Sequence, residues 1–203
     1  MVKNIIFDVG NVLFEYDWGK PFREIGLSEE DVERIGQGMF HDEIWSKWDA
    51  GLYTLDEVRR HYISKYPEDE EAINGFMSRI GDIRVDRPAV WERIPLLKQK
   101  GYKMYLLSNY SVELFEAHTE GLEFFKYMDG GIVSYAVHYI KPQPEIYDCL
   151  LDKYKLDPAE CIFFDDREEN TEAAEKKGIK SVTIVSQAQL LGEIEKLLAV
   201  SKV

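Results

Sequence analysis

Short apolar runs that end in polar residues recur along the chain and define its framework. The three clearest are residues 5–7 before Asp8, 104–107 before Ser108, and 161–164 before Asp165. Runs of this length, rich in β-branched and aromatic residues and followed by turn residues, are typical of buried strands. Residues 181–185 form a fourth strand candidate, and residues 131–134 form a weaker fifth.

Helical patterns lie between these runs, at residues 88–100, 145–154 and 169–177. Gly101 and Gly178 follow the first and the third of them, where a helix C-cap commonly stands. Strands that alternate with helices predict an α/β fold, here a doubly wound parallel sheet with helices on both faces.

Residues 15–85 follow a different pattern, with helix-like spacing and no convincing strand. Thr54 and Glu57 have the spacing of a capping box, which marks the start of a helix. We therefore predict a core built from residues 1–14 and 86–203, with an α-helical cap inserted at residues 15–85.

The composition narrows the class of protein. Among 203 residues there are 25 Lys and Arg against 38 Asp and Glu, so the net charge is −13. This acidity argues against a nucleic acid partner, because phosphate backbones are bound by clustered Lys and Arg. No apolar run approaches the ~18 residues of a membrane span, and the two cysteines make no disulfide framework. We expect a cytoplasmic protein with no membrane partner, present as a monomer or weak dimer.

Polar side chains gather just past the ends of the three clearest strand candidates. Asp8 follows the first, Ser108 and Asn109 follow the second, and Asp165 and Asp166 follow the third. In an open parallel sheet these ends form one crevice, where ligands bind. Carboxylates so close together repel one another, so a proton or a cation must neutralise them. Mg²⁺ fits, because it prefers oxygen ligands and is held by one or two carboxylates together with substrate phosphate.

Lys141 supplies a positive charge for the same crevice. Pro142 restricts the backbone of Lys141 to an extended form, and Pro144 suits the first turn of a helix. The lysine is therefore held on a stiff loop, where its ammonium could neutralise the carboxylates and bind a phosphoryl oxygen. The simpler alternative is a solvated surface lysine.

Four short segments taken together resemble the motifs of the haloacid dehalogenase-like (HAD) hydrolases. They are residues 8–13 (Asp-Val-Gly-Asn-Val-Leu), 107–109 (Leu-Ser-Asn), 141–142 (Lys-Pro) and 164–166 (Phe-Asp-Asp). The resemblance covers residues 5–185 and implies a Rossmann-like core, with the helical insertion as a mobile cap. Within the superfamily, the first and last motifs resemble bacterial α-D-glucose-1-phosphate phosphatases.

This resemblance implies a Mg²⁺-dependent phosphatase that hydrolyses a small phosphorylated metabolite, such as a sugar phosphate. Asp8 would attack phosphorus to form an aspartyl-phosphate, which water then hydrolyses. The Ser108 hydroxyl and the Asn109 backbone N–H would bind phosphate oxygens, and Lys141 would stabilise the transferring group. The resemblance implies four metal ligands: an Asp8 oxygen, the Gly10 carbonyl, Asp166, and Asp165 directly or through water.

One departure from the family pattern concerns the proton transfers. HAD phosphatases usually carry a second Asp two residues after the nucleophile, and this chain has Gly10 there. A missing general acid/base costs on the order of 10²–10⁴-fold in rate. Glu15 or Asp17 could supply a carboxyl instead. Three alternatives to a phosphatase stay open: a haloacid dehalogenase, a phosphomutase, and a non-catalytic phosphate-binding regulatory module.

The inserted segment is expected to select the substrate, because it is rich in large aromatic side chains. These include Trp18, Phe22, Phe40, Trp45, Trp48 and Tyr53. They either form the core of the insertion or, with His41, Asp42 or Glu43, face the crevice and contact a sugar.

Overall fold

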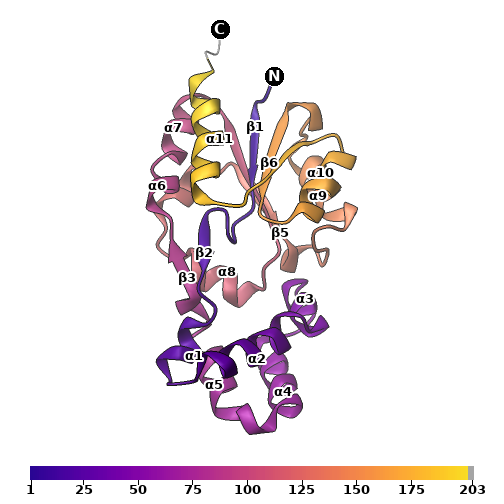
Figure 1. Cartoon of the computed structure of the whole chain (residues 1–203). Coiled ribbons are helices and arrows are strands. Elements are labelled where there is room, and N and C mark those ends of the chain that lie inside the picture. The colour runs from indigo at the N-terminus through magenta and orange to yellow at the C-terminus, as the bar shows by residue number, and fades with distance from the viewer. Residues whose placement is uncertain (201–203) are drawn as a thin grey trace.

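A five-stranded parallel sheet is the largest sheet in the computed structural model, which describes residues 1–200 (Figure 1). Across the sheet the strands are β5 (Gly130–Val133), β4 (Lys103–Ser108), β1 (Asn4–Phe7), β6 (Cys161–Asp165) and β7 (Lys180–Thr183). All neighbouring strands pair in parallel. The predicted α/β fold with a parallel sheet is therefore confirmed.

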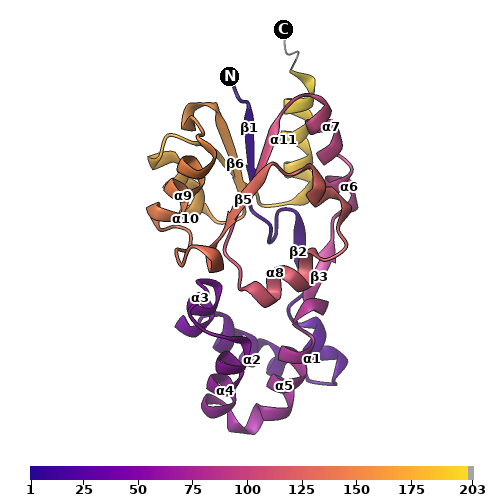
Figure 2. The same ribbon diagram turned by 180° about the vertical axis from the view of Figure 1, so that it is seen from behind.

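Helices cover both faces of this sheet, as Figures 1 and 2 show from opposite sides. One face carries α6 (Pro88–Trp91), α7 (Ile94–Gln99) and α11 (Gln187–Ala199), and the other carries α9 (Pro144–Tyr154) and α10 (Glu168–Lys176). Successive side chains of a strand point to opposite faces. Ile5 and Phe7 therefore pack with Ile94 in one core, while Ile6 packs with Tyr147 in the other.

The helix predicted at residues 88–100 is two helices, α6 and α7. Pro95 lies in the first turn of α7, where backbone N–H groups have no partner within the helix, so the missing N–H of proline is tolerated. In one continuous helix the same position would need that N–H for a hydrogen bond. Gly101 and Gly178 adopt positive φ, at 78° and 82°, as expected of residues that end helices.

Five α-helices between residues 20 and 78 form a second lobe beyond the carboxyl ends of the strands, which we call the helical lobe (Figure 1). They are α1 (Lys20–Glu24), α2 (Glu29–Phe40), α3 (Glu43–Asp49), α4 (Leu55–Lys65) and α5 (Glu70–Ser78). The predicted capping box is present at α4, where Thr54 and Glu57 bind each other's backbone N–H groups. The rings of Phe22 and Phe76 stack with their centroids 4.6 Å apart, and Trp48 is fully buried. These aromatic residues therefore belong to the core of the lobe.

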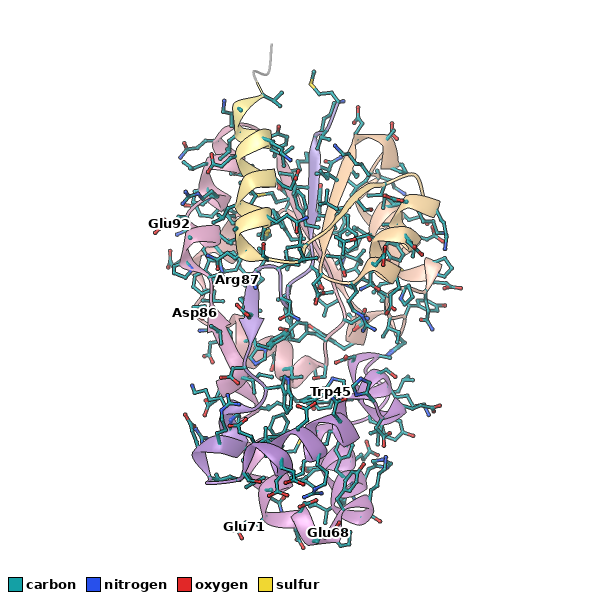
Figure 3. All side chains as sticks on the ribbon, viewed as in Figure 1. Trp45, Glu68, Glu71, Asp86, Arg87 and Glu92 are labelled. Carbon is teal, nitrogen blue, oxygen red and sulfur yellow. The ribbon has the colours of Figure 1, made fainter. Side chains whose placement is uncertain are left out.

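A two-stranded antiparallel ribbon joins the lobe to the sheet. It consists of β2 (Phe14–Tyr16) and β3 (Arg84–Asp86), and Figure 3 shows Asp86 and Arg87 at this junction. The expectation of no strand within residues 15–85 is wrong at both ends of the segment. Each strand has three residues, which is too short for an alternating pattern to show in the sequence.

The remaining elements are short. Helix α8 (Val112–Thr119), which the sequence analysis did not predict, begins at its N-cap Ser111. Five 3-10 helices complete the description: η1 (Pro67–Asp69), η2 (Ile80–Ile83), η3 (Glu123–Tyr127), η4 (Ser134–Ala136) and η5 (Pro158–Glu160).

None of the helices within residues 1–200 has both the length and the apolar character needed to cross a bilayer. The predicted cytoplasmic location and oligomeric state stay predictions. The last three positions of the predicted core segment, residues 201–203, lie outside the described residues.

Candidate active site

Asp8 lies at the carboxyl end of β1, the central strand, and it is 7% exposed. Three donors converge on its Oδ1 atom: the Ser108 hydroxyl at 2.6 Å, the Val9 backbone N–H at 2.7 Å and the Lys141 ammonium at 2.9 Å. Among the described residues none donates a hydrogen bond to the other oxygen, Oδ2. One side of the carboxylate is thus fixed, and the other is free for a ligand.

Lys141 links the carboxyl ends of β1 and β6, where Asp8 and Asp165 lie. Its Nζ atom lies 2.6 Å from Asp165 Oδ2 as well as 2.9 Å from Asp8 Oδ1, and the residue is 3% exposed. Asp165 is fully buried, and its Oδ1 accepts from the Arg167 backbone N–H and the Asn170 side chain, both at 2.9 Å. The alternative of a solvated surface lysine is therefore wrong, because Lys141 is enclosed between two carboxylates.

The side chain of Asn109 holds the backbone of Lys141 in place. Asn109 Oδ1 accepts from the Lys141 N–H at 2.7 Å, and its Nδ2 donates to the Lys141 carbonyl at 2.9 Å. From the sequence, only the backbone N–H of Asn109 was expected to take part in the site. This two-way contact shows that the side chain positions the lysine loop against β4.

Asp166 faces Asp8 across the crevice and is oriented by Asn11, whose Nδ2 donates to Asp166 Oδ2 at 2.9 Å. Asn11 has a φ of 53°, a left-handed conformation that Asn tolerates better than most residues. Arg87 stabilises this turn by donating to the Asn11 carbonyl at 2.7 Å. In the sequence Asn11 stands out only as part of a motif, and no pattern marks Arg87.

Three carboxylates could hold a cation together. One oxygen from each of Asp8, Asp165 and Asp166 lies within 4.8 Å of the other two. Asn170 Oδ1 is buried without a partner at the wall of the same cavity, so a further acceptor is unused. The all-oxygen donor set suits Mg²⁺. Asp165 differs from the other two, because both of its oxygens already accept hydrogen bonds, and its role as a direct ligand stays a prediction.

Burial and mutual repulsion disfavour the charged forms of the clustered carboxylates. Burial raises the pKa of Asp8 to about 7 against the lowering effect of Lys141, and the charges of Asp165 and Asp166 add to the rise. Burial likewise raises the pKa of Asp166. Burial disfavours the charged lysine, but Asp165 and Asp8 outweigh this effect and raise the pKa of Lys141. A divalent cation would relieve the remaining repulsion between carboxylates.

A cavity of about 390 Å³ opens between the carboxylate cluster and the helical lobe. The lobe contributes Phe40, Trp45, Ser46 and Asp49 to its wall. Figure 3 shows Trp45 on the side of the lobe that faces the sheet. A second cavity of about 200 Å³ adjoins it, sharing Phe40, Trp45 and Asp49, and adds apolar side chains such as Leu114. The pair of cavities offers a polar end at Asp8 and an aromatic wall beyond it.

The lobe residues that face the cavities differ partly from those expected. Phe40 and Trp45 line the cavities, whereas His41, Asp42 and Glu43 line neither of the two. Asp42 is the N-cap of α3, where its carboxylate accepts from the Ile44 N–H. Asp49, which the sequence analysis did not single out, lines both cavities.

Gly10 is required by the close approach of Tyr16. A Cβ atom at position 10 would lie 2.7 Å from the ring of Tyr16. Tyr16 lines the cavity, whereas Glu15 and Asp17 lie on either side of it in the chain and form ion pairs with Arg87 and Arg23. The suggestion that Glu15 or Asp17 supplies a carboxyl is therefore wrong, because neither lines the cavity. Glu15 precedes Tyr16 on β2, where successive side chains point to opposite sides, and Asp17 lies beyond the strand and pairs with Arg23.

Gly10→Ala should destabilise the fold by about 1–3 kcal/mol, because the added methyl group collides with a ring held by neighbouring side chains. Tyr16→Ala should remove the collision. We expect the double variant to be less destabilised than the sum of the two single variants by about 0.5–3 kcal/mol. Urea unfolding of the four proteins measures this coupling, and strictly additive effects would show that Tyr16 is not what excludes a side chain at position 10.

Comparison with known proteins identifies the family. A model of the haloacid dehalogenase-like hydrolases matches residues 2–178. The chain belongs to this family. The predicted resemblance is confirmed, and with it the prediction that the chain is a hydrolytic enzyme.

Relatives of this HAD-like hydrolase include several named phosphatases. It is 27% identical to D-ribitol-5-phosphate phosphatase of Bacteroides thetaiotaomicron, over 89% of this chain and 91% of the relative. It is 24% identical to a phosphorylated carbohydrates phosphatase of Thermotoga maritima, over 88% of this chain and 82% of the relative. These names are consistent with a phosphoric monoester hydrolase.

Solved structures share the fold of this hydrolase over nearly its whole length. A HAD-family enzyme from Bacteroides thetaiotaomicron, in complex with magnesium and inorganic phosphate, superposes with a TM-score of 0.72 at 25% identity, covering 92% of this chain and 96% of that one. L-2-haloacid dehalogenase from Xanthobacter autotrophicus superposes with a TM-score of 0.68 at 19% identity, covering 97% of this chain and 83% of that one. The second match shows the fold alone.

Proposed function

We propose that the chain is a Mg²⁺-dependent phosphatase that hydrolyses a small sugar or polyol phosphate, such as glucose 1-phosphate, through an aspartyl-phosphate on Asp8. The observation that carries the proposal is the convergence of Asp8, Asp165 and Asp166 around Lys141. Magnesium and phosphate in the related structure and relatives named for ribitol phosphate and phosphorylated carbohydrates support it.

The reaction begins when a carboxylate oxygen of Asp8 attacks phosphorus as the bond to the leaving oxygen breaks. Water then attacks the aspartyl-phosphate, releasing phosphate and restoring the carboxylate. The backbone N–H of Asn109 is proposed to bind one phosphate oxygen. The Ser108 hydroxyl, which donates to Asp8 at 2.6 Å, is proposed to turn its proton to another phosphate oxygen when substrate binds. The Lys141 ammonium stabilises the charge spread over the transferring group.

The metal would be held by an Asp8 oxygen, Asp166 and the backbone carbonyl of Gly10, with Asp165 directly or through water. When bound, Mg²⁺ offsets the repulsion between the Asp8 carboxylate and the phosphate dianion and orients the phosphate. Asn11 keeps Asp166 pointed at this position.

The helical lobe would act as a cap. Its aromatic residues Phe40 and Trp45 line the cavity over Asp8, where apolar sugar faces can pack against rings. Opening would admit substrate, and closure would exclude water from the phosphoryl group.

Phosphate release should depend on Mg²⁺. A screen of phosphorylated metabolites should find one or more sugar or polyol phosphates that are hydrolysed with Mg²⁺. Addition of EDTA should lower the rate on the order of 10²-fold or more, since the metal supplies several kcal/mol of charge stabilisation. Restoring Mg²⁺, but not the same concentration of NaCl, should recover the activity.

The same assays distinguish the alternatives. Equal rates with Mg²⁺ and EDTA would contradict the proposed metal. Halide release from haloacids in EDTA would indicate a dehalogenase, and exchange of phosphate between the C1 and C6 positions of a sugar would indicate a mutase. Sugar-phosphate binding without turnover, unchanged in Asp8→Asn, would indicate a regulatory module.

A further inference from the structure

Asp49 brings a carboxyl group from the helical lobe to the cavity that holds Asp8. It is the last residue of α3, and it lines both the cavity over Asp8 and the adjoining aromatic cavity. Its place at the boundary of the two cavities is where the bond between a phosphoryl group and its leaving group would lie. The other polar residues that line both cavities are Tyr16, Tyr110 and Asn109, and the side chain of Asn109 is already bound to the backbone of Lys141.

Contacts with the part of the chain that contains the five-stranded sheet, which we call the sheet lobe, hold the end of α3 at this place. The indole N–H of Trp48 donates to Glu113 at 3.0 Å, and the His138 ring donates to the Ala50 carbonyl at 2.8 Å. These bonds flank Asp49 on both sides in the sequence, so its backbone is fixed against the sheet lobe. The Ser134 hydroxyl also donates to the Asp49 carbonyl.

The surroundings of Asp49 suit a carboxyl that gains and loses a proton near neutral pH. Among residues 1–200 no Lys or Arg forms an ion pair with it. Burial raises the pKa of Asp49 to about 7, and the charge of Asp8 adds to this, against lowering effects of the Ser111 backbone N–H and Lys141. A general acid works best when its pKa is near the working pH.

Tyr16 is the other candidate for proton transfer, but its hydroxyl proton is already used. The Ile80 carbonyl can only accept, so His118 Nε2, 3.1 Å away, carries the ring proton. His118 Nδ1 then accepts from the Tyr110 hydroxyl at 3.2 Å, and the Tyr110 oxygen accepts from the Tyr16 hydroxyl. Tyr16 can therefore only accept from the cavity. Burial also raises the pKa of Tyr16 well above its usual range.

We propose that Asp49 is the general acid and base of the reaction, in the role that Gly10 has no side chain to perform. The inference rests on the proposed phosphatase function. As the bond between phosphorus and the leaving oxygen breaks, that oxygen takes the proton of the Asp49 carboxyl. In the second step the carboxylate accepts a proton from water while the water oxygen attacks phosphorus, so the original protonation of Asp49 and the carboxylate of Asp8 are both restored.

In this arrangement proton transfer depends on the contact between the helical lobe and the sheet lobe. Asp8, Lys141 and Asp166 belong to the sheet lobe, whereas the proposed acid lies on α3 of the helical lobe. The catalytic set is complete only when the contacts of Trp48 and His138 are made.

The test compares two substrates whose leaving groups need different amounts of help, using kcat/KM because it reports the first phosphoryl transfer. Nitrophenolate leaves 4-nitrophenyl phosphate readily without a proton, whereas the alkoxide of glycerol 2-phosphate needs one. Asp49→Asn should lower kcat/KM about 10²–10⁴-fold for glycerol 2-phosphate and less than about tenfold for 4-nitrophenyl phosphate. Asp49→Glu, which keeps the carboxyl, should recover part of the loss.

Glu43→Gln is the matched control, because it removes the same charge from an exposed position at the other end of α3. It should change both rates by no more than about twofold, and thermal melting should show all variants folded. Equal losses for the two substrates in Asp49→Asn would overturn the role of Asp49 and leave the phosphatase proposal standing. A wild-type chain that hydrolyses neither these two substrates nor any phosphorylated metabolite of the screen with Mg²⁺ would overturn the proposed function, and the role of Asp49 with it.

Discussion

Asp8→Asn should abolish phosphate release while the protein stays folded. The amide cannot form the aspartyl-phosphate, and loss of a covalent nucleophile removes the whole catalysed path rather than one contribution to it. We expect residual turnover below about 10⁻³ of wild type. The Asn side chain has the same shape and can still accept from Ser108 and Val9, as the carboxylate does now. Steady-state phosphate release and thermal melting measure the two parts of this prediction.

Asp152→Asn provides the control for charge, because Asp152 lies exposed on α9 and away from the carboxylate cluster. Its turnover should equal that of the wild type. A residual rate of more than a few per cent in Asp8→Asn would count against Asp8 as the nucleophile.

Lys141→Ala should have the second largest effect, on turnover and stability together. Its ammonium is the only Lys or Arg group within 4 Å of the Asp8 and Asp165 carboxylates among the described residues. Removing one partner of a buried ion pair costs about 3–5 kcal/mol, since the remaining charges stay buried. Removing a donor to the transferring group should lower kcat by about 10²–10³-fold. Urea unfolding and single-turnover phosphate release, both well below the melting temperature, measure the two losses.

The surface variant Lys196→Ala removes the same charge from α11, where Glu193 is the one ion-pair partner of Lys196 within residues 1–200. It should change stability by less than about 1 kcal/mol. Near wild-type turnover of a folded Lys141→Ala protein would show that the lysine neutralises the cluster without acting on the phosphoryl group.

The sheet and most of the polar cluster could be predicted because their signals are local. Each of β1, β4 and β6 is a short apolar run, and the polar residue that follows it is fixed at the carboxyl edge by the geometry of parallel strands. The position of Lys141 was predictable for the same reason, since two prolines define its loop. Asn109 was only half predicted, because the contact of its side chain with the Lys141 backbone joins two segments far apart in the sequence.

The residues that close the site from the other side could not be predicted in this way. Tyr16 lies on a three-residue strand whose partner, β3, is nearly 70 positions away, so no periodic pattern marks it. Asp49 is one acid among many in the helical insertion, and only the docking of α3 on the sheet lobe distinguishes it from Asp42 and Glu43. Both depend on packing between segments rather than on the residues next to them.

The central claim is that Asp8 receives the phosphoryl group beside a divalent cation. Its most direct test is mass spectrometry of peptides from a reaction quenched in acid during turnover, which preserves an acyl phosphate. The account predicts one phosphoryl group on Asp8 when substrate and Mg²⁺ are both present, and none when EDTA replaces Mg²⁺. Turnover with no phosphoryl group on Asp8, or with the label on another residue, would contradict it.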